Sequence, residues 1–431
     1  MVTWIEVFVL AGALFALLAS GIPVAFAFGI LNVVAAYYIF GSVEALSFLV
    51  QAAFSSVSNI SLTAVPFFLL MGNIFVHTGL SKVVLDAVEV VLSGVKSSGS
   101  YVAVGSGALF GALMGASIAS TAVLGSTLIK QMRLHGYSKR LTIGPILGAG
   151  TLSNLIPPSV GAVLIGGLGG VPIGDLLIAG MGPAALIIAL FCVYIAWQSR
   201  QETSRPSPEA GPSLRARGRA IGSLLPLVIP VFAVTGVIYL GIATPTEAAA
   251  TGSAATLFVA LAYRRMSWKI LKNILLETIS ISAMILLIVA SSKAYSQLLA
   301  ITGLSREIAA FMADTVPSTT VAVAVFVGVV LLLGCVMDPA SVIFVTIPLF
   351  VIIIDQLKVD PIWFGVLFSM AIGIGGITPP FGLNLFVLKG VAPRDVSIRD
   401  IYRIAIPYVF MEVLALAVII FVPAIATFLI R

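Results

Sequence analysis

Residues 152–163 read LSNLIPPSVGAV and place two adjacent prolines, shortly after a serine and an asparagine, inside a long apolar run. A second apolar run, at residues 375–386, reads GGITPPFGLNLF and carries a second proline pair. Because proline removes a backbone donor and clashes with the preceding turn, each pair should break a helix and free carbonyl oxygens. Such a break is tolerated in a membrane only where protein or a polar cavity satisfies the freed groups. The two stretches therefore predict two broken helices around a polar site.

The composition indicates an all-α integral membrane protein. Of the 431 residues, 60% are hydrophobic and only 9% are charged, and the mean hydropathy is +1.17. A soluble domain carries roughly a quarter charged residues. The alternating pattern of an outer-membrane barrel is absent, so the membrane-spanning segments should be helical. The net charge of +6 comes from basic residues in short loops, which argues for a topological role and against nucleic-acid binding.

Apolar runs divide the chain into membrane spans and two segments of a different kind. Residues 101–130 and 318–354 are interrupted in the middle by GASIAST at 115–121 and by MDPAS at 337–341. Each half of such a segment is too short to cross the bilayer, so both segments are predicted to be re-entrant hairpins. The predicted spans are 4–20, 22–40, 62–79, 141–168, 175–197, 221–241, 244–263, 275–300, 361–388 and 401–430.

The basic residues support this topology. With the Arg-rich segment 198–220 in the cytoplasm and the hairpins not crossing, only Arg306, Lys358 and Arg431 of the loop and terminal basic residues fall outside. This is the positive-inside bias expected of a membrane protein. Both termini should then face outward, and the first span should be retained because its start lacks the basic region of a signal peptide.

The chain also repeats itself. Thr78-Gly79-Leu80-Ser81 returns at 302–305, Ala116-Ser117 at 340–341 and Pro157-Pro158 at 379–380, all in the same order and at nearly one offset. In the predicted topology the copies face opposite sides. We therefore expect two inverted repeats, residues 1–197 and 221–431, joined by a cytoplasmic basic linker at 198–220. Inverted repeats with hairpins and broken helices are typical of secondary transporters.

Unwound carbonyls and hydroxyls suit a hard cation such as Na⁺, and the half-helix after each break suits an anionic group. Asp338, a carboxylate predicted in mid-membrane, is the sharpest candidate; capping the start of a helix is a compatible role. Lys293, Glu247 and Glu412 receive no firm role. The predicted sodium-binding residues are Ser117, Gly150, Ser153, Asn154, Asp338, Ser341, Gly376 and Thr378. The predicted substrate-binding residues are Ser120, Thr121, Pro157, Pro158, Pro379, Pro380, Gly382 and Asn384.

The motifs GALMGASIASTAVLG at 111–125, HGY at 135–137, LSNLIPPS at 152–159, GIATPTEAAATG at 241–252, MDPAS and ITPPFGLNLFV at 377–387 occur in one order along the whole chain. This order resembles the large membrane subunit of tripartite ATP-independent periplasmic (TRAP) transporters, the DctM-like family. One position departs from the pattern: Ser120 stands where many relatives carry an acidic residue.

The resemblance implies a sodium-coupled importer of an organic acid in the bacterial inner membrane, with an elevator mechanism and at least two sodium ions per cycle. It also implies two partners, a small four-helix membrane subunit (DctQ-like) and a soluble periplasmic substrate-binding protein (DctP-like). No organic cofactor is expected, and no nucleotide-binding motif is present.

Three other functions stay open. A stand-alone sodium/dicarboxylate symporter would share the hairpins but need no binding protein. A channel is compatible with the broken helices. An intramembrane enzyme is disfavoured, because the sequence shows neither an HExxH motif nor a nucleophile–base pair placed for catalysis. The sequence does not identify the organic acid.

Overall fold

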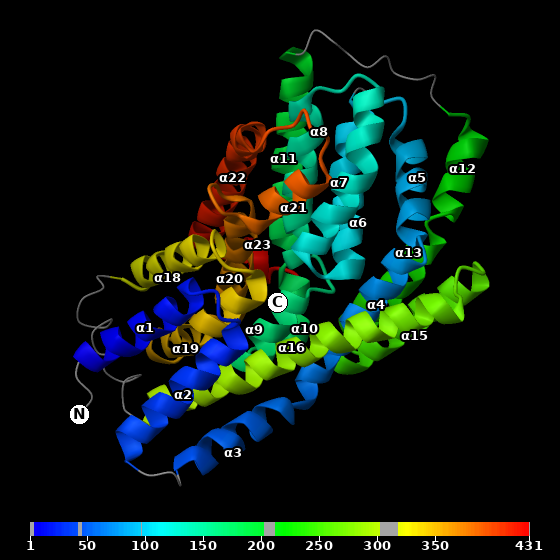
Figure 1. Cartoon of the computed structure of the whole chain (residues 1–431). Coiled ribbons are helices and arrows are strands. Elements are labelled where there is room, and N and C mark those ends of the chain that lie inside the picture. The colour runs from blue at the N-terminus through cyan, green and yellow to red at the C-terminus, as the bar shows by residue number, and fades with distance from the viewer. Residues whose placement is uncertain (1–3, 42–44, 96, 202–211, 302–317, 431) are drawn as a thin grey trace.

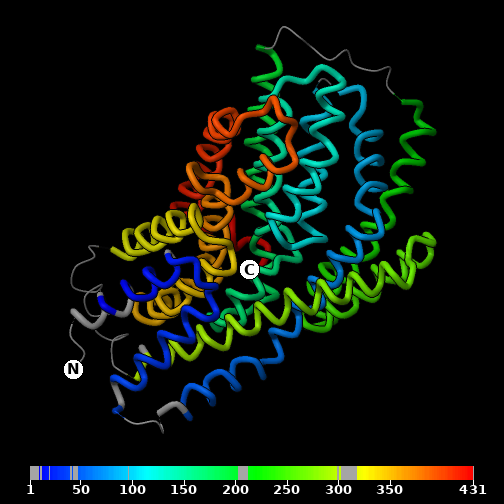
Figure 2. Tube along the Cα trace, in the orientation of Figure 1, coloured from blue at the N-terminus to red at the C-terminus, as the bar shows by residue number. Residues whose placement is uncertain are grey.

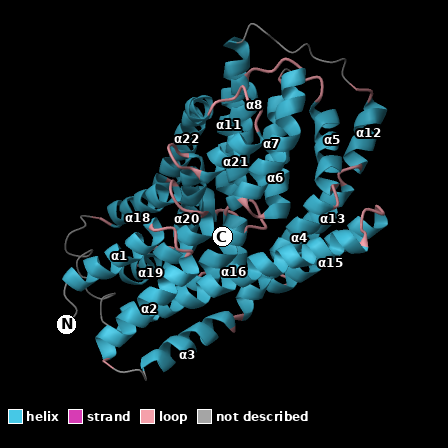
Figure 3. Cartoon of the chain, in the orientation of Figure 1, coloured by secondary structure: helices cyan, strands magenta, loops and turns pink. Residues whose placement is uncertain are grey.

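A computed structural model describes residues 4–41, 45–95, 97–201, 212–301 and 318–430. Within these ranges the chain is helical throughout and contains no strand, as Figure 3 shows. The prediction of an all-α membrane protein is confirmed. The second copy of the repeated Thr-Gly-Leu-Ser motif, at 302–305, lies outside the described residues.

The first predicted hairpin is a pair of helices that meet at Gly115. Helix α6 (Ser98–Met114) and helix α7 (Ser117–Leu134) pack against each other, and both pack against α8 (Lys139–Thr151). Gly115 ends α6 in the left-handed conformation, with φ 58°, which glycine adopts without strain. The first two residues of GASIAST therefore form the turn between two helices of about five turns each, and the remaining five begin α7.

The second predicted hairpin has the same design. Helix α18 (Thr319–Gly334) and helix α19 (Pro339–Leu357) pack together, and Asp338 is the N-cap of α19. The proline at the first position of α19 favours this start, because its missing N–H is not needed there. Helix α19 is by itself long and apolar enough to cross a membrane, so the expectation that each half is too short is wrong for this half. Entry and exit on the same side of the membrane stay a prediction for both hairpins.

Both proline pairs lie in helix breaks. Helix α8 ends in a 3₁₀ turn, η2 (Leu152–Asn154), and the chain resumes helix at α9 (Val160–Gly169). Helix α20 (Pro361–Ile377) is likewise followed by α21 (Leu383–Val391). The peptide bonds Pro157–Pro158 and Pro379–Pro380 are both cis.

Four consecutive helices of the first half correspond in order to four consecutive helices of the second half. Helices α18, α19, α20 and α21 begin about 222 residues after α6, α7, α8 and α9, respectively. The halves also exchange contacts, because α9 packs against α19 and α21 packs against α7. Both hairpin–helix units are therefore interlocked in one core, and Figure 2 shows orange segments of the second unit beside cyan and teal segments of the first. Its remaining helices are α10 (Ile173–Ala179), α11 (Met181–Gln201), α22 (Ile398–Phe421) and α23 (Ala424–Thr427).

A slanted layer of long helices lies along one side of this core (Figure 1). Its central element, α16 (Trp268–Ile301), packs against α2 (Val24–Phe40), α3 (Ala45–Val57) and α4 (Ala64–His77). Hydrogen bonds fix the layer internally: the Asn73 amide donates to the Thr278 hydroxyl at 3.0 Å, and the Ser253 hydroxyl donates to the Phe67 carbonyl at 2.6 Å. The other helices outside the core are α1 (Trp4–Ala19), η1 (Ile60–Thr63), α5 (Leu80–Leu92), α12 (Leu214–Gly222), α13 (Leu225–Val231), η3 (Phe232–Gly236), α14 (Val237–Tyr239) and α15 (Pro245–Ala262).

The structure adds helices that the apolar runs did not predict. Helix α5 was missed because LSKVVLDAVEVVL mixes charged and apolar residues, the pattern of a helix with one buried face. Helix α3 was missed because three serines and a glutamine interrupt or flank its apolar stretch. The end of the predicted linker is also helical in α12, and the predicted span 221–241 is divided among α12, α13, η3 and α14. Among the described residues only five helices, or six with the bent pair that α12 begins, are long and apolar enough to cross a membrane alone.

Candidate functional site

A cavity of about 220 Å³ lies where the two hairpin tips meet the layer of long helices. The first tip contributes Gly115, Ala116, Ser117 and Ile118, and the second contributes Asp338, Pro339 and Ala340. The rest of the lining is mostly apolar and comes from α4, α9, α16, α19 and α20, with Asn154 and Ser369 as further polar members. A small, largely apolar pocket with a few convergent polar groups is typical of a site for a small molecule.

The first tip is docked on the first proline break. The Val160 N–H donates to the Gly115 carbonyl at 3.2 Å. A Cβ at Gly115 would lie 2.8 Å from the Pro158 carbonyl oxygen, so only glycine fits this approach. The N-cap of α7 is Ala116, which provides no side-chain cap. The first N–H groups of α7 are therefore open to a ligand at the edge of the cavity.

Asn154, which also lines the cavity, has a buried side-chain donor without a partner in the described part of the chain. This residue is only 8% exposed, and its Nδ2 has no hydrogen-bond partner among the described residues. The backbone carbonyl of Asn154 accepts a hydrogen bond from the Ser159 hydroxyl at 3.0 Å. A buried amide without a partner is costly, so this donor is suited to a bound acceptor.

Next to the cavity, oxygen atoms gather between α7 and the end of α8. A Cβ at Gly150 would lie 2.0 Å from Thr121 Oγ1 and 3.5 Å from the Ser117 carbonyl oxygen. Ser153 belongs to the same turn, and its hydroxyl donates to the Gly150 carbonyl at 2.6 Å. The Thr121 hydroxyl is buried and, like that of Ser120, has no partner among the described residues. Gly150 thus leaves room for three other predicted site residues, Ser117, Thr121 and Ser153, to come close to one another.

The second tip is closed by its own side chain. Asp338 caps α19: Oδ1 accepts from the Ser341 N–H at 3.1 Å, and Oδ2 accepts from the Ser341 hydroxyl. Asp338 also lines the cavity. Both roles considered from the sequence, a helix cap and a carboxylate facing the site, are compatible with this geometry. Among the described residues no hydrogen bond joins Asp338 to the second proline break.

The second break forms a separate, tight turn. The Gly382 N–H donates to the Thr378 carbonyl at 3.1 Å, and a Cβ at Gly382 would lie 2.6 Å from the Gly376 carbonyl oxygen. The Thr378 hydroxyl donates to the Ile374 carbonyl at 2.6 Å. Asn384 is 1% exposed, and neither end of its amide has a partner among the described residues. The amide lies over Gly376, where a Cβ would be 3.4 Å from Nδ2.

The structure therefore brings only some of the predicted residues to one place. Ser117, Asn154 and Asp338 line the cavity, and the first oxygen cluster lies beside it. The prolines do not line it: Pro157 and Pro158 are buried behind the first tip, and the Pro380 carbonyl accepts from the Tyr402 hydroxyl at 2.5 Å. Their contact with substrate, and that of Gly382 and Asn384, stays a prediction.

Two parts of the cavity were not anticipated. Ser369 is a single hydroxyl in an apolar helix, and Leu69, Ile281, Met284 and Ile285 are apolar residues of the neighbouring layer. A lone serine usually bonds its own helix, and Ser369 does donate to the Gly365 carbonyl at 3.0 Å. Apolar residues in a membrane helix carry no signal that separates a cavity wall from a lipid contact.

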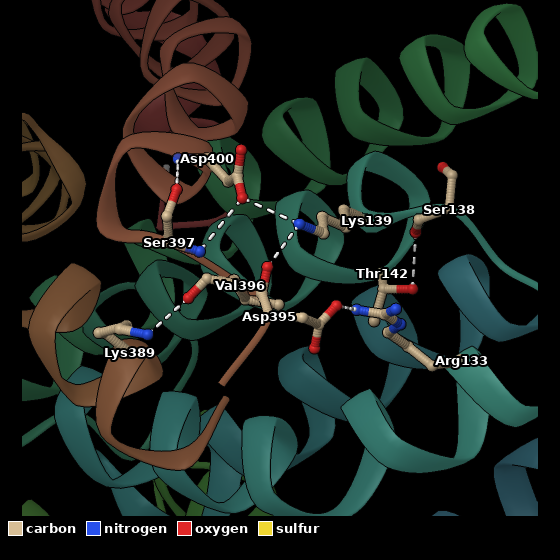
Figure 4. A network of polar contacts seen from close by, with 9 residues as sticks. All are labelled: Arg133, Ser138, Lys139, Thr142, Lys389, Asp395, Val396, Ser397 and Asp400. Atoms are coloured by element: carbon tan, nitrogen blue, oxygen red, sulfur yellow. Dashed lines mark hydrogen bonds and ion pairs between the residues drawn. The ribbon is translucent and has the colours of Figure 1, made fainter. Parts of the chain in front are cut away.

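A polar network ties the two repeats together away from the cavity (Figure 4). Arg133, at the end of α7, pairs with Asp395 in the loop between α21 and α22 at 2.5 Å. Lys139 donates to the Asp395 carbonyl at 2.7 Å and to the Asp400 carboxylate at 3.0 Å. The hydrogen bond from Arg133 is the main reason that the pKa of Asp395 lies below its usual value. The base of the first hairpin is thus fixed to the second repeat.

Comparison with known proteins identifies the family. The family model described as "Tripartite ATP-independent periplasmic transporter, DctM component" matches residues 11–425. The chain belongs to this family. It is 30% identical to the C4-dicarboxylate TRAP transporter large permease of Pseudomonas aeruginosa over 86% of this chain and 87% of that protein. It is 29% identical to the ectoine TRAP transporter large permease of Halomonas elongata over 98% of both.

These relatives are transport permeases and not enzymes, so this DctM-family chain is a multi-pass transport permease. A solved transporter shares the fold: the YdaH transporter of Alcanivorax borkumensis has a TM-score of 0.64 and 12% identity, covering 88% of this chain and 89% of that one. At this identity the likeness concerns the fold alone.

Proposed function

We propose that this chain is the large permease of a sodium-driven TRAP importer, and that the cavity between the hairpin tips binds one carboxylate-bearing organic acid. The observation that carries the proposal is the convergence of both tips on a single pocket. A site shared by two inverted repeats near the bilayer midplane is the usual arrangement in secondary transporters.

The donors of the cavity favour an anionic group. The uncapped start of α7 offers backbone N–H groups at the positive end of a helix dipole, and the Asn154 amide offers a further N–H. The apolar walls from Ile281, Met284 and Ile285 would cover the carbon skeleton. Relatives of similar identity are named for C4-dicarboxylates and for ectoine. These ligands share a carboxylate, and it is this group that we assign to the first tip.

Sodium fits the oxygen cluster beside this subsite. The Thr121 hydroxyl, the Ser117 carbonyl and the turn at Gly150 supply hard oxygen ligands of the kind that sodium prefers, and Thr121 Oγ1 is buried without a partner. Thr121, which the sequence predicts to bind substrate, is therefore assigned to the cation site. A second cation would be held near Gly376, Thr378 and Asn384, where the amide oxygen of Asn384 is also unpaired. Each cation entering with the membrane potential contributes about 2.3 kcal/mol per 100 mV.

The proposed movement is of elevator type. The interlocked hairpin core would slide along the layer built on α16, with the cavity at their boundary. Apolar side chains such as Leu69 and Ile281 make most of this boundary at the cavity, and few polar contacts would have to break there. The salt bridges of Arg133 and Lys139 would keep the core rigid while it moves.

The partners and the orientation belong to the same proposal. As one component of a tripartite system, the permease would act with a small membrane subunit and a periplasmic substrate-binding protein. It would lie in the bacterial inner membrane with both termini in the periplasm, because this orientation places nearly all basic loop residues inside.

Uptake by the reconstituted complex tests the function. Proteoliposomes that contain the permease and the small subunit would be supplied with the binding protein and with labelled C4-dicarboxylates, 2-oxo acids or ectoine. We expect uptake of one organic acid that requires an inward sodium gradient and the binding protein. Uptake without the binding protein would favour the stand-alone symporter, and uptake that ignores the sodium gradient would refute sodium coupling.

A further inference from the structure

A carboxyl group, Glu412, is buried in the core at the face where α22 meets α8. Its residue is only 2% exposed. One turn earlier on α22, the Tyr408 ring lies against α8 over Gly144 and Gly148, where a Cβ would come within 2.3 Å and 2.7 Å of the ring. These two glycines let α22 approach α8 closely. Glu412 therefore reaches the last turn of α8, directly before the first proline break.

The contacts of the Thr151 hydroxyl favour a protonated carboxyl group at Glu412. The Thr151 hydroxyl oxygen lies 2.6 Å from Glu412 Oε1 and 2.7 Å from the Gly148 carbonyl oxygen. A hydroxyl has one hydrogen, and a carbonyl can only accept. A protonated Glu412 satisfies both contacts with full hydrogen bonds: Thr151 donates to the Gly148 carbonyl, and the carboxylic acid donates to the Thr151 hydroxyl.

The surroundings agree with a neutral acid. Helix α20, which packs on the same part of α22, contains no charged residue. The basic residues of α8, Lys139 and Arg140, lie in its first turn, and Lys139 pairs with Asp400. Among the described residues no basic side chain pairs with Glu412. A carboxylate here would be a buried charge without compensation, which is strongly disfavoured.

Thr151 is linked to the cavity through α20. A Cβ at Gly373 would lie 3.1 Å from Asn154 Nδ2 and 3.5 Å from Thr151 Cβ, so both residues rest on this glycine. Ser153, between them, caps the Gly150 carbonyl. Two contacts thus hold the turn that carries Gly150, Ser153 and Asn154. One is with Gly373 of α20, and the other is with Glu412 of α22.

From this geometry we propose that Glu412, in its acid form, is a positioning residue. It fixes the last turn of α8, so that Gly150 and Asn154 keep the positions needed to bind the cation and the carboxylate. The effect on sodium rests on the proposed function, whereas the protonated state does not. The described residues around the second proline break make no equivalent contact, because the residue of α20 in the place of Thr151 is Gly373.

Infrared spectroscopy of the purified full-length protein tests the protonated state directly. The difference spectrum between wild type and Glu412→Gln should contain the C=O stretch of a protonated carboxylic acid in a non-aqueous environment at neutral pH. A carboxylate band in its place would overturn the proposal. This measurement stands even if sodium does not drive transport.

Sodium affinity tests the positioning role. In the reconstituted complex, Glu412→Leu should raise the half-saturating sodium concentration about tenfold, the effect of losing one buried hydrogen bond. Glu412→Gln keeps a donor and should restore a nearly wild-type value. Thr151→Val should equal Glu412→Leu, and the double variant should be no worse than either, since both remove one contact.

The outcomes separate the two proposals. Wild-type transport that ignores sodium refutes the proposed function but leaves the infrared test. Sodium-dependent wild-type transport with unchanged sodium affinity in Glu412→Leu refutes the positioning role alone. If Glu412→Leu does not fold, Thr151→Val decides: an unchanged affinity in this variant overturns the role.

Discussion

The two hairpin tips share one architecture and differ in chemistry. Helix α7 begins at Ala116 without a side-chain cap, whereas α19 begins at Asp338, whose carboxylate accepts from the backbone and the hydroxyl of Ser341. By helix starts, Ala116 and Asp338 occupy the same place in the two repeats. One tip therefore offers donors to an anion, and the other already contains an anion.

This difference explains how a symmetric scaffold can bind an asymmetric set of ligands. Two open helix starts would attract two carboxylates, and two aspartates would attract only cations. With one of each, the cavity can hold a substrate carboxylate at the first tip, while the negative second tip attracts sodium and repels a misplaced anion. The repeats supply the geometry, and single substitutions within them supply the selectivity.

The largest effect should come from the second tip. Asp338→Ala removes both the charge and the cap, so we expect sodium-driven uptake to fall to background and stability to fall by about 1 kcal/mol. Asp338→Asn is the matched control, because asparagine caps a helix equally well but carries no charge. If uptake by the asparagine variant equals that of wild type, Asp338 is a cap and nothing more.

Glycines at corresponding breaks sharpen the comparison. Gly150→Ala would place a Cβ 2.0 Å from Thr121 Oγ1, so it should destabilise the protein by about 1–3 kcal/mol and weaken sodium binding. In Gly376→Ala the nearest atom, Asn384 Nδ2, is 3.4 Å away, which is ordinary contact. That control should melt at or slightly above the wild-type temperature, because alanine favours helix. Equal losses of stability in Gly150→Ala and Gly376→Ala would show that the two helix breaks are packed alike.

Two threonines test whether the first cluster is kept for a cation. Thr121 Oγ1 is buried without a partner, so Thr121→Val should stabilise the sodium-free protein by about 1 kcal/mol and reduce its stabilisation by sodium to the part that the second cation site supplies. The Thr378 hydroxyl donates to the Ile374 carbonyl, so Thr378→Val should instead lose about 1 kcal/mol. Thermal unfolding with sodium and with choline measures both. A sodium response as large as that of wild type in Thr121→Val would remove Thr121 from the cation site.

The sequence predicts the breaks and turns of this molecule better than its contacts. Proline pairs, GASIAST and MDPAS identified both broken helices and both hairpin turns, because prolines and small polar residues act locally on the backbone. They did not show that Asn154 and Asp338 line one cavity and that Asn384 lies elsewhere, since this depends on how the repeats interlock. The repeated Ala-Ser pair also misaligned the tips by two residues: the helix starts match Ala116 to Asp338.

The smallest effect should come from the network at the far end of the core. The hydrogen bond from Arg133 lowers the pKa of Asp395 in the folded protein, so this contact adds stability above the unfolded pKa of about 3.9. The contribution disappears as the pH falls through the lower folded pKa. The pair is half-exposed, so Asp395→Asn should lower the melting temperature only slightly at pH 7 and not at all in strong acid. A gap between variant and wild type that widens toward acid would show that Asp395 opposes folding. A large loss of uptake without a change in melting temperature would instead show that this contact between the two repeats takes part in the transport movement itself.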